Sequence, residues 1–257
     1  MHRVTVSSPA IQGETITIRD AKELHHLIRV VRVKRGDRLE CFDGAGHGYR
    51  GVICHLTRQA LVVQVDETFD EPSAASQILL AQALIKPERF EWALQKATEL
   101  GVTEVVPLTT QRTRSQPAAR DPEKKVERWR RIAAEAAKQC GRLTIPVIKS
   151  PQPLESFVET LTPSSLALMP TLSRETVPLK TVLDGPGRYS SVVTLIGPEG
   201  DFTHEEAALA ERRGARLVSL GRRTLRSETA AITLLAILQY TFTGRSVPNP
   251  PPRENSA

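Results

Sequence analysis

The stretch VVTLIGPEGDFTHEEAALAERRGARLVSLGRRTLRSETAAITLLAILQYTF, residues 192–242, carries the pattern that decides the fold. It begins with a continuous apolar run at Val192–Ile196, which is typical of a strand buried on both faces. A capping box then opens a helix at Thr203. A second strand at Arg216–Leu220 and a final apolar helix at Glu228–Phe242 follow. This alternation of strand and helix predicts a mainly parallel sheet that is covered by helices.

The same alternation continues upstream, as far as residue 78. The apolar run Ile78–Leu84 predicts another buried strand, and Glu88–Leu100 predicts a helix that ends at Gly101. Trp92 and Trp129 fit the core-facing sides of two helices. The further elements that we predict are a strand at Glu104–Leu108, a long helix that Asp121 and Pro122 open and Gly141 ends, and a strand at Leu166–Met169.

The first 70 residues have a different sequence pattern, in which short strand-like runs are separated by turns. These runs are Thr15–Ile18, Leu39–Phe42, Tyr49–Ile53 and Leu61–Val65. Short strands at close spacing predict a small barrel or sandwich. The stretch Asp66–Ser76, acidic and then small and polar, marks the connection to the second part. We therefore predict a small β-barrel at 1–70, a linker at 71–77, an α/β domain at 78–245 and a disordered tail at 246–257.

The composition of the 257 residues excludes several classes of protein. With 40% hydrophobic and 25% charged residues, the chain is neither disordered, nor collagen-like, nor a disulfide scaffold. No apolar run approaches the roughly 20 residues of a membrane helix, and MHRVTVSSPA at the N-terminus has no apolar signal core. Three scattered cysteines fit neither a metal knuckle nor a disulfide framework. We expect a cytoplasmic protein with no bound metal and no membrane contact.

The net charge of +6 is unevenly distributed along the chain. Residues 86–149 hold fourteen Lys/Arg against eight Asp/Glu, a balance of +6, while the regions on either side are neutral. A second basic cluster, opposed only by Asp37, consists of Arg29, Arg32, Lys34, Arg35 and Arg38. Clustered basic residues favour a polyanionic partner such as nucleic acid, although solvated helix faces would give the same pattern.

Three loops follow predicted strands, where ligands bind in open parallel sheets. They are Met169–Thr171, Gly197–Phe202 and Gly221–Ala230. The second loop, GPEGDF, contains two glycines and a proline but no G-x-G-x-x-G and no Lys-Ser/Thr. A dinucleotide or triphosphate site is therefore poorly supported. The loop suits a ligand held by main-chain groups, and it is also compatible with a plain strand-to-helix turn.

The third loop concentrates positive charge at the start of a helix. Arg222, Arg223 and Arg226 lie where backbone N–H groups already favour anions. Ser227 and Glu228 supply capping chemistry and one negative charge. This crowding favours a functional contact with an anion or with RNA over the alternative, a surface cluster of salt bridges.

Several segments together resemble the RsmE family of bacterial methyltransferases, which act on uridine N3 of small-subunit ribosomal RNA. They are LIGPEGDF (195–202), LGRRTLRSETAA (220–231), KATELGVTEVVPL (96–108), EAAKQCGR (135–142) and HHLIRVVRVKRGDRLECFDGAG (25–46). The resemblance implies a SPOUT-type, trefoil-knotted α/β methyltransferase domain preceded by a PUA-like β-barrel. It also implies S-adenosylmethionine (SAM) as the methyl donor, and a homodimer. Periodicity alone would not predict the knot, because knots are nearly absent from proteins.

The resemblance places SAM among the three loops. The residues that it implies around SAM are Met169, Pro170, Leu195, Ile196, Gly197, Glu199, Gly200, Leu220, Gly221, Thr224, Leu225 and Arg226. The chain departs from the family at Asp201, where glycine is more frequent, at Thr224, where an aliphatic residue is usual, and at Ser227, where threonine is usual. The loop at Met169 also lacks an expected histidine.

Uracil N3 carries a proton and lies on the Watson–Crick edge, so the base must be unpaired or flipped out. Because the sulfonium methyl is already activated, the protein chiefly has to align the reacting atoms. We predict that Arg226 stabilises negative charge on the uracil or holds its phosphate. Glu228 is predicted to orient Arg226 or to assist proton removal, with helix capping as the alternative.

The resemblance implies U1498 of 16S ribosomal RNA, within the 30S subunit, as the target. The residues that we predict to bind RNA are Arg3, Arg29, Arg32, Lys34, Arg35, Arg112, Arg114, Arg142, Arg222 and Arg223. Two other functions stay open on the sequence: a SPOUT methyltransferase of the ribose 2′-oxygen, and a non-catalytic RNA-binding factor in ribosome assembly.

Overall fold

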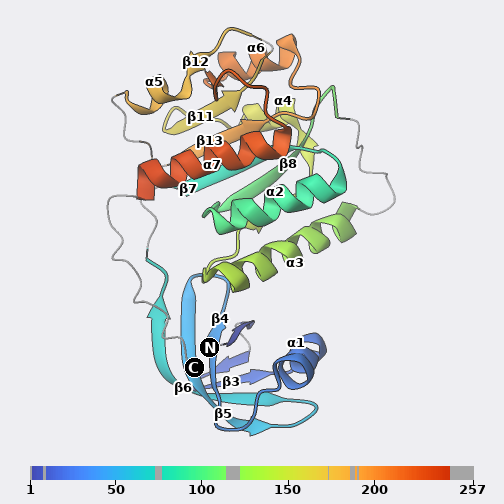
Figure 1. The fold of residues 1–257 in the computed structure, drawn as a ribbon, viewed down its shortest axis with the longest axis vertical. Helices are drawn as coiled ribbons and strands as arrows, with labels where there is room; N and C mark the ends of the chain where they lie inside the picture. The colour runs from blue at the N-terminus through green and yellow to red at the C-terminus, as the bar shows by residue number, and fades with distance from the viewer. Residues whose placement is uncertain are drawn as a thin grey trace.

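The computed structural model describes residues 2–7, 10–72, 77–113, 122–172, 174–185, 189 and 191–243. Two sheets lie towards opposite ends of the long axis, and α3 lies between the first sheet and α2 (Figure 1). The predicted tail at 246–257 falls outside the described residues. Within the described part, none of the helices combines the length and hydropathy that a membrane span requires.

The N-terminal sheet has six strands in the order β1-β4-β5-β6-β3-β2. The strands are β1 (His2–Thr5), β2 (Ile11–Gln12), β3 (Thr15–Ile18), β4 (Arg38–Phe42), β5 (His47–Leu56) and β6 (Leu61–Asp70). β1 pairs with β4 in parallel, and the other neighbours are antiparallel. Alternating residues such as Ile16, Leu39 and Ile53 are buried in its core. Residues 66–70 continue β6, so the acidic stretch is a strand end and not the start of the connection.

A helical segment that the sequence analysis did not predict closes one side of this sheet. α1 (Ala21–His25) starts at Asp20, whose side chain accepts hydrogen bonds from the next backbone N–H groups. It continues into a π-helix, η2 (His26–Val31), which ends at Arg32 with φ 62°. Leu24 and Leu27 are buried against the sheet core. This segment presents the basic cluster, because its cations lie on the exposed side and in the turn that follows.

The C-terminal sheet has eight strands, and its pairings are parallel, as predicted. Its order is β10-β8-β7-β13-β11-β14-β12, with β9 also beside β8. The strands are β7 (Gln77–Ala83), β8 (Glu104–Thr109), β9 (Val147–Ile148), β10 (Gln152–Pro153), β11 (Ser165–Pro170), β12 (Val177–Pro178), β13 (Ser191–Ile196) and β14 (Arg216–Ser219). β13 lies at the centre, between β7 and β11, and therefore brings its following loop to the middle of the sheet edge.

Helices cover both faces of this sheet. They are α2 (Pro87–Glu99), α3 (Pro122–Cys140), α4 (Leu154–Val158), α5 (Leu179–Leu183), α6 (His204–Arg212) and α7 (Ser227–Thr243). Residues of α2, α3, α5 and α7 share one hydrophobic cluster, and those of α4 and α6 share the other. Trp129 is 6% exposed and packs 4.6 Å from the Phe90 ring. Trp92 is 46% exposed, so its predicted place in the core is wrong: the buried face of α2 is formed by its neighbours Phe90, Ala93 and Leu94.

Arg3 joins the two parts of the molecule. Its Nε donates to Glu40 Oε1 at 2.6 Å, and its Nη atoms donate to the carbonyls of Ala137 at 3.2 Å and of Arg142 at 3.1 Å. The guanidinium also lies 4.9 Å from the Phe42 ring centroid. Only 14% of the side chain is exposed, so this geometry does not support the prediction that Arg3 binds RNA.

Arg142 has a similar internal role on the other side of the junction. Its Nη1 donates to the carbonyls of Thr98 at 2.8 Å and of Val102 at 2.9 Å, and Glu71 lies 3.9 Å from its Nε. Glu71 in turn accepts from the backbone N–H of Thr144 at 2.7 Å. With 12% of its side chain exposed, Arg142 holds the end of α2 and the residues after α3 together, and its position does not support a contact with RNA.

Candidate functional site

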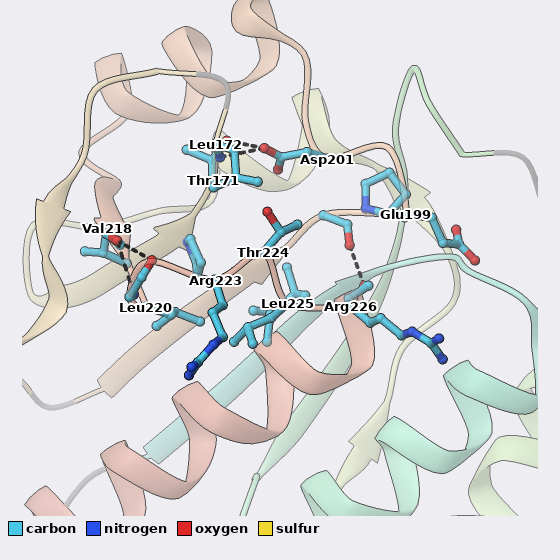
Figure 2. Close-up of a pocket in the computed structure, with 18 of the residues that line it drawn as sticks. Thr171, Leu172, Glu199, Asp201, Val218, Leu220, Arg223, Thr224, Leu225 and Arg226 are labelled. Carbon is cyan, nitrogen blue, oxygen red and sulfur yellow. Dashed lines mark hydrogen bonds between the residues drawn. The ribbon is translucent and has the colours of Figure 1, made fainter.

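The main candidate site is a cavity of about 300 Å³ at the carboxyl ends of β11, β13 and β14 (Figure 2). Its walls come from residues 170–172, from residues 196–201 and from residues 218–230, and Arg89 joins them from the first turn of α2. The three loops that the sequence analysis selected therefore meet at one place. Among the described residues, no group of three or more His, Cys, Asp or Glu side chains could hold a metal ion.

Most of the residues that the resemblance assigns to SAM line this cavity. Those in the wall are Pro170, Ile196, Gly197, Glu199, Leu220, Gly221, Thr224, Leu225 and Arg226. Met169 and Leu195 are fully buried in the hydrophobic cluster behind it, and Gly200 faces the Arg112 side chain. The wall also contains residues to which the resemblance assigns no contact with SAM, some of them within the same three loops: Arg89, Thr171, Leu172, Pro198, Asp201, Val218, Ser219, Arg223, Ser227 and Ala230.

The loop after β13 is a tight bend. A Cβ atom on Gly197 would lie 3.2 Å from atoms of Asp201 and Phe202, which is a tight contact, so the close return of the chain favours glycine there. Phe202 is fully buried and anchors the far end of the loop. The predicted capping box is present: Glu206 N donates to Thr203 Oγ1, and Thr203 N donates to Glu206 Oε2 at 2.8 Å. The bend is therefore held between the end of β13 on one side and the buried Phe202 and the capped start of α6 on the other.

A buried polar link connects this loop to the start of α7. Ser227 Oγ donates to the Gly197 carbonyl at 2.5 Å and accepts from Gln82 Nε2 at 2.9 Å. Gln82 is 1% exposed and lies in β7, where the sequence analysis noted only a buried strand. A glutamine inside the apolar run Ile78–Leu84 is the signal that could have identified it, since buried polar side chains need partners.

Three arginines give the cavity its positive charge. Arg89, Arg223 and Arg226 all line it, and Figure 2 shows the side chains of Arg223 and Arg226 extending away from Asp201 in different directions. Glu228, in the first turn of α7, is 7% exposed, and its Oε1 lies 3.7 Å from Arg89 Nε. Its Oε2 is buried and has no hydrogen-bond partner among the described residues. Glu228 therefore pairs with Arg89, and its predicted action on Arg226 or on a proton stays a prediction.

Five of the predicted RNA-binding residues are exposed in two places. Arg29, Arg32, Lys34 and Arg35 are exposed on η2 and in the turn after it, on the N-terminal part. Arg222 is exposed beside the cavity, next to Arg223.

Two further candidates need separate mention. Arg112 is exposed, but its Nη1 donates to the Gly200 carbonyl at 2.7 Å, so it also supports the loop after β13. Arg114 lies outside the described residues.

Two sequence families match this chain. The family described as RNA methyltransferase domain matches residues 72–239, and the family described as RNA methyltransferase PUA domain matches residues 18–66. A curated relative from Synechocystis sp., named ribosomal RNA small subunit methyltransferase E, is 35% identical over 237 residues. That match covers 91% of this chain and 76% of the relative.

Solved structures agree with these matches over nearly the whole chain. A methyltransferase from Legionella pneumophila in complex with the bound cofactor SAM is 32% identical, with a TM-score of 0.82 over 92% of this chain and 96% of that one. A ribosomal RNA small subunit methyltransferase E from Neisseria gonorrhoeae bound to S-adenosyl methionine is 26% identical. Its TM-score is 0.84, over 94% of this chain and 98% of that one.

Proposed function

Because this chain belongs to the RsmE family of ribosomal RNA methyltransferases, we propose that it transfers a methyl group from SAM to N3 of a uridine in small-subunit ribosomal RNA. The target that we propose is U1498 of 16S ribosomal RNA. The observation that carries the proposal is the cavity at the carboxyl ends of β11, β13 and β14, since it is built largely from loop backbone and apolar side chains.

The residues of the cavity fit SAM. Ile196, Val218, Leu220 and Leu225 provide apolar walls for an adenine ring, and the bends at 197–199 and 219–221 bring main-chain groups to the same space. The volume of about 300 Å³ is at the lower end of the range for ligand sites. At Gly221, with φ 127°, an added Cβ atom would meet no other atom within 4 Å, so the wall is open there. When bound, SAM supplies an activated methyl group on a sulfonium centre.

The protein's own groups have two tasks, which are to align the uracil and to make loss of the N3 proton easier. In the reaction a bond forms between the methyl carbon and N3, the bond from that carbon to sulfur breaks, and the N3 proton leaves. We assign to Arg226 the stabilisation of the negative charge that develops on the uracil as this proton leaves. A guanidinium next to the uracil lowers the cost of this charge by direct electrostatic attraction.

Glu228 acts on this site through Arg89. It lies 3.7 Å from Arg89 Nε, and Arg89 lines the cavity. A buried carboxylate oxygen without a partner is costly, so substrate binding that satisfies Glu228 Oε2 would recover that cost. Transfer of the N3 proton to Glu228 is the alternative role. A Glu228→Gln variant separates the two, because only loss of a proton acceptor changes the pH dependence of the transfer rate.

The exposed basic cluster on η2 and in the turn after it is proposed to hold the RNA backbone. Arg29, Arg32, Lys34 and Arg35 present their charges to solvent on a part of the chain that matches the RNA methyltransferase PUA domain. The partner is then 16S ribosomal RNA or the 30S subunit, in the cytoplasm. A homodimer is part of the same proposal, because the resemblance to the RsmE family implies it.

The experiment that tests the function incubates the purified protein with methyl-labelled SAM and small-subunit RNA, followed by mass spectrometry of the nucleosides. We expect N3-methyluridine among the nucleosides, and the label in the RNase fragment that contains U1498. A label on a ribose 2′-oxygen would instead show the other type of SPOUT methyltransferase. RNA binding without transfer, on naked RNA and on 30S subunits, would show a non-catalytic binding factor.

A further inference from the structure

Asp201 occupies an unusual backbone position at the edge of the cavity. Its φ is 61°, in the left-handed region that most side chains avoid. The carboxylate accepts three hydrogen bonds: Oδ2 from Thr171 Oγ1 at 2.9 Å and from Leu172 N at 2.6 Å, and Oδ1 from Phe202 N at 2.8 Å. Figure 2 shows the side chain directed from its own loop towards Thr171 and Leu172. Charge-assisted hydrogen bonds of this kind offset the backbone strain.

These hydrogen bonds connect two of the three walls of the cavity. At the outer end of the wall at 170–172, Thr171 is buried, whereas Leu172 is 68% exposed and is not fixed by burial. The loop that carries Asp201 is itself anchored by Arg112, which donates to the carbonyls of Gly200 at 2.7 Å and of Phe202 at 3.4 Å. Asp201 thus links this anchored loop to the outer end of the wall at 170–172.

We propose that Asp201 is a positioning residue that fixes the 170–172 wall against the loop after β13 and so sets the affinity of the cavity for SAM. This inference rests on the proposed function, because SAM is taken as the occupant of the cavity. A wall held in place before binding avoids the entropic cost of ordering it when the ligand arrives. Because Asp201 acts on the cavity, its substitution should leave RNA binding by the exposed basic cluster on η2 and in the turn after it unchanged.

Substitution of Asp201 by glycine separates the effect of the carboxylate from the effect of the strained backbone. Glycine adopts φ 61° without strain, so Asp201→Gly removes the three hydrogen bonds and relieves the local cost at the same time. We expect the Kd for SAM, measured by titration calorimetry, to rise about tenfold, a size typical of lost hydrogen bonds to a charged group. Asp201→Asn also tolerates this φ and keeps one carbonyl acceptor, so its Kd should rise only about threefold.

A charge-matched control completes the test. Asp184→Asn removes the same charge from an exposed position just after α5, away from the cavity, and should leave the Kd unchanged. The affinity for RNA should be that of the unsubstituted protein in all of these variants.

Several outcomes would overturn the inference. One is an Asp201→Gly protein that binds SAM as tightly as the unsubstituted protein, and another is a variant whose Tm falls while its Kd for SAM stays the same. If the unsubstituted protein does not bind SAM, both this inference and the proposed function fail. If it binds SAM but methylates another nucleotide or a ribose, only the proposed target fails, because the Kd comparison does not depend on the product.

Discussion

The arginines at the junction of the two sheets and those in the loop before α7 carry the same charge in the sequence, but they have different roles in the structure. Arg3 and Arg142 are largely buried, and their guanidinium groups donate to backbone carbonyls of several elements. Arg222, Arg223 and Arg226 are exposed, and the last two line the cavity. A count of positive charge therefore does not separate cations that hold the fold from cations that face a ligand. Burial and hydrogen bonding do separate them.

The largest effect on function should come from the loop before α7. Arg226→Ala is expected to reduce single-turnover methylation about 100-fold, as is typical when one charge-stabilising donor is lost from an active site. Its Tm should be unchanged, because the side chain is exposed. Rapid-quench assays at saturating SAM and RNA measure the rate, and thermal unfolding serves as the control. Normal methylation by this variant would remove Arg226 from the mechanism.

At the junction, the same type of substitution should change stability and not chemistry. Among the described residues, Arg3→Ala leaves the buried Glu40 with Arg50 as its remaining ion-pair partner, and it removes donors from the carbonyls at the end of α3. We expect the free energy of unfolding to fall by about 2–3 kcal/mol. Denaturant titration measures this loss. If instead the RNA affinity of Arg3→Ala fell at unchanged stability, the distinction between the two groups of arginines would be wrong.

The smallest effect is expected in the basic cluster after η2, where two neighbouring arginines allow a matched comparison. Arg35 is exposed, whereas Arg38 pairs with Asp66 at 2.8 Å. Arg35→Ala should weaken RNA binding a few-fold and lower the slope of log affinity against log salt by about 1. Arg38→Ala should have a weaker effect, because its charge is already partly compensated. Equal salt slopes for both variants and the unsubstituted protein would exclude this cluster from the RNA contact.

The part of the site that could be predicted from the sequence is the part that is local in the chain. The loop after β13 follows a buried strand and precedes the capping box at Thr203, so its place at the sheet edge follows from one short stretch. Arg89 and Gln82 could not be placed in this way, because tertiary packing brings Arg89 from α2 and Gln82 from β7 to the start of α7. The resemblance to the RsmE family supplied the identity of the ligand, which local patterns left open.

Two features of the helices differ from what the sequence predicts, and each difference has a physical cause. Trp92 is apolar and helical, yet it lies on the side of α2 that faces solvent, because the helix rotates by about 100° per residue and the core takes only one side. The helical segment at 21–31 was not predicted, since its π-helical part does not follow the usual helical period. The predicted contacts of Arg3 and Arg142 with RNA rest on charge alone, because a sequence does not show which carbonyls a guanidinium will meet.

The hydroxyl of Ser227 also has a consequence for the order in which the protein can be made. It bridges Gln82 and the Gly197 carbonyl, so the cavity is completed only after a residue near the end of the described chain has returned to a strand 145 positions earlier. A nascent chain emerging from the ribosome therefore has no finished donor site until almost all of its C-terminal part has been synthesised. Contacts over such separations form late and slowly. Chains that end before Ser227 therefore lack this link and have no complete site for the methyl donor.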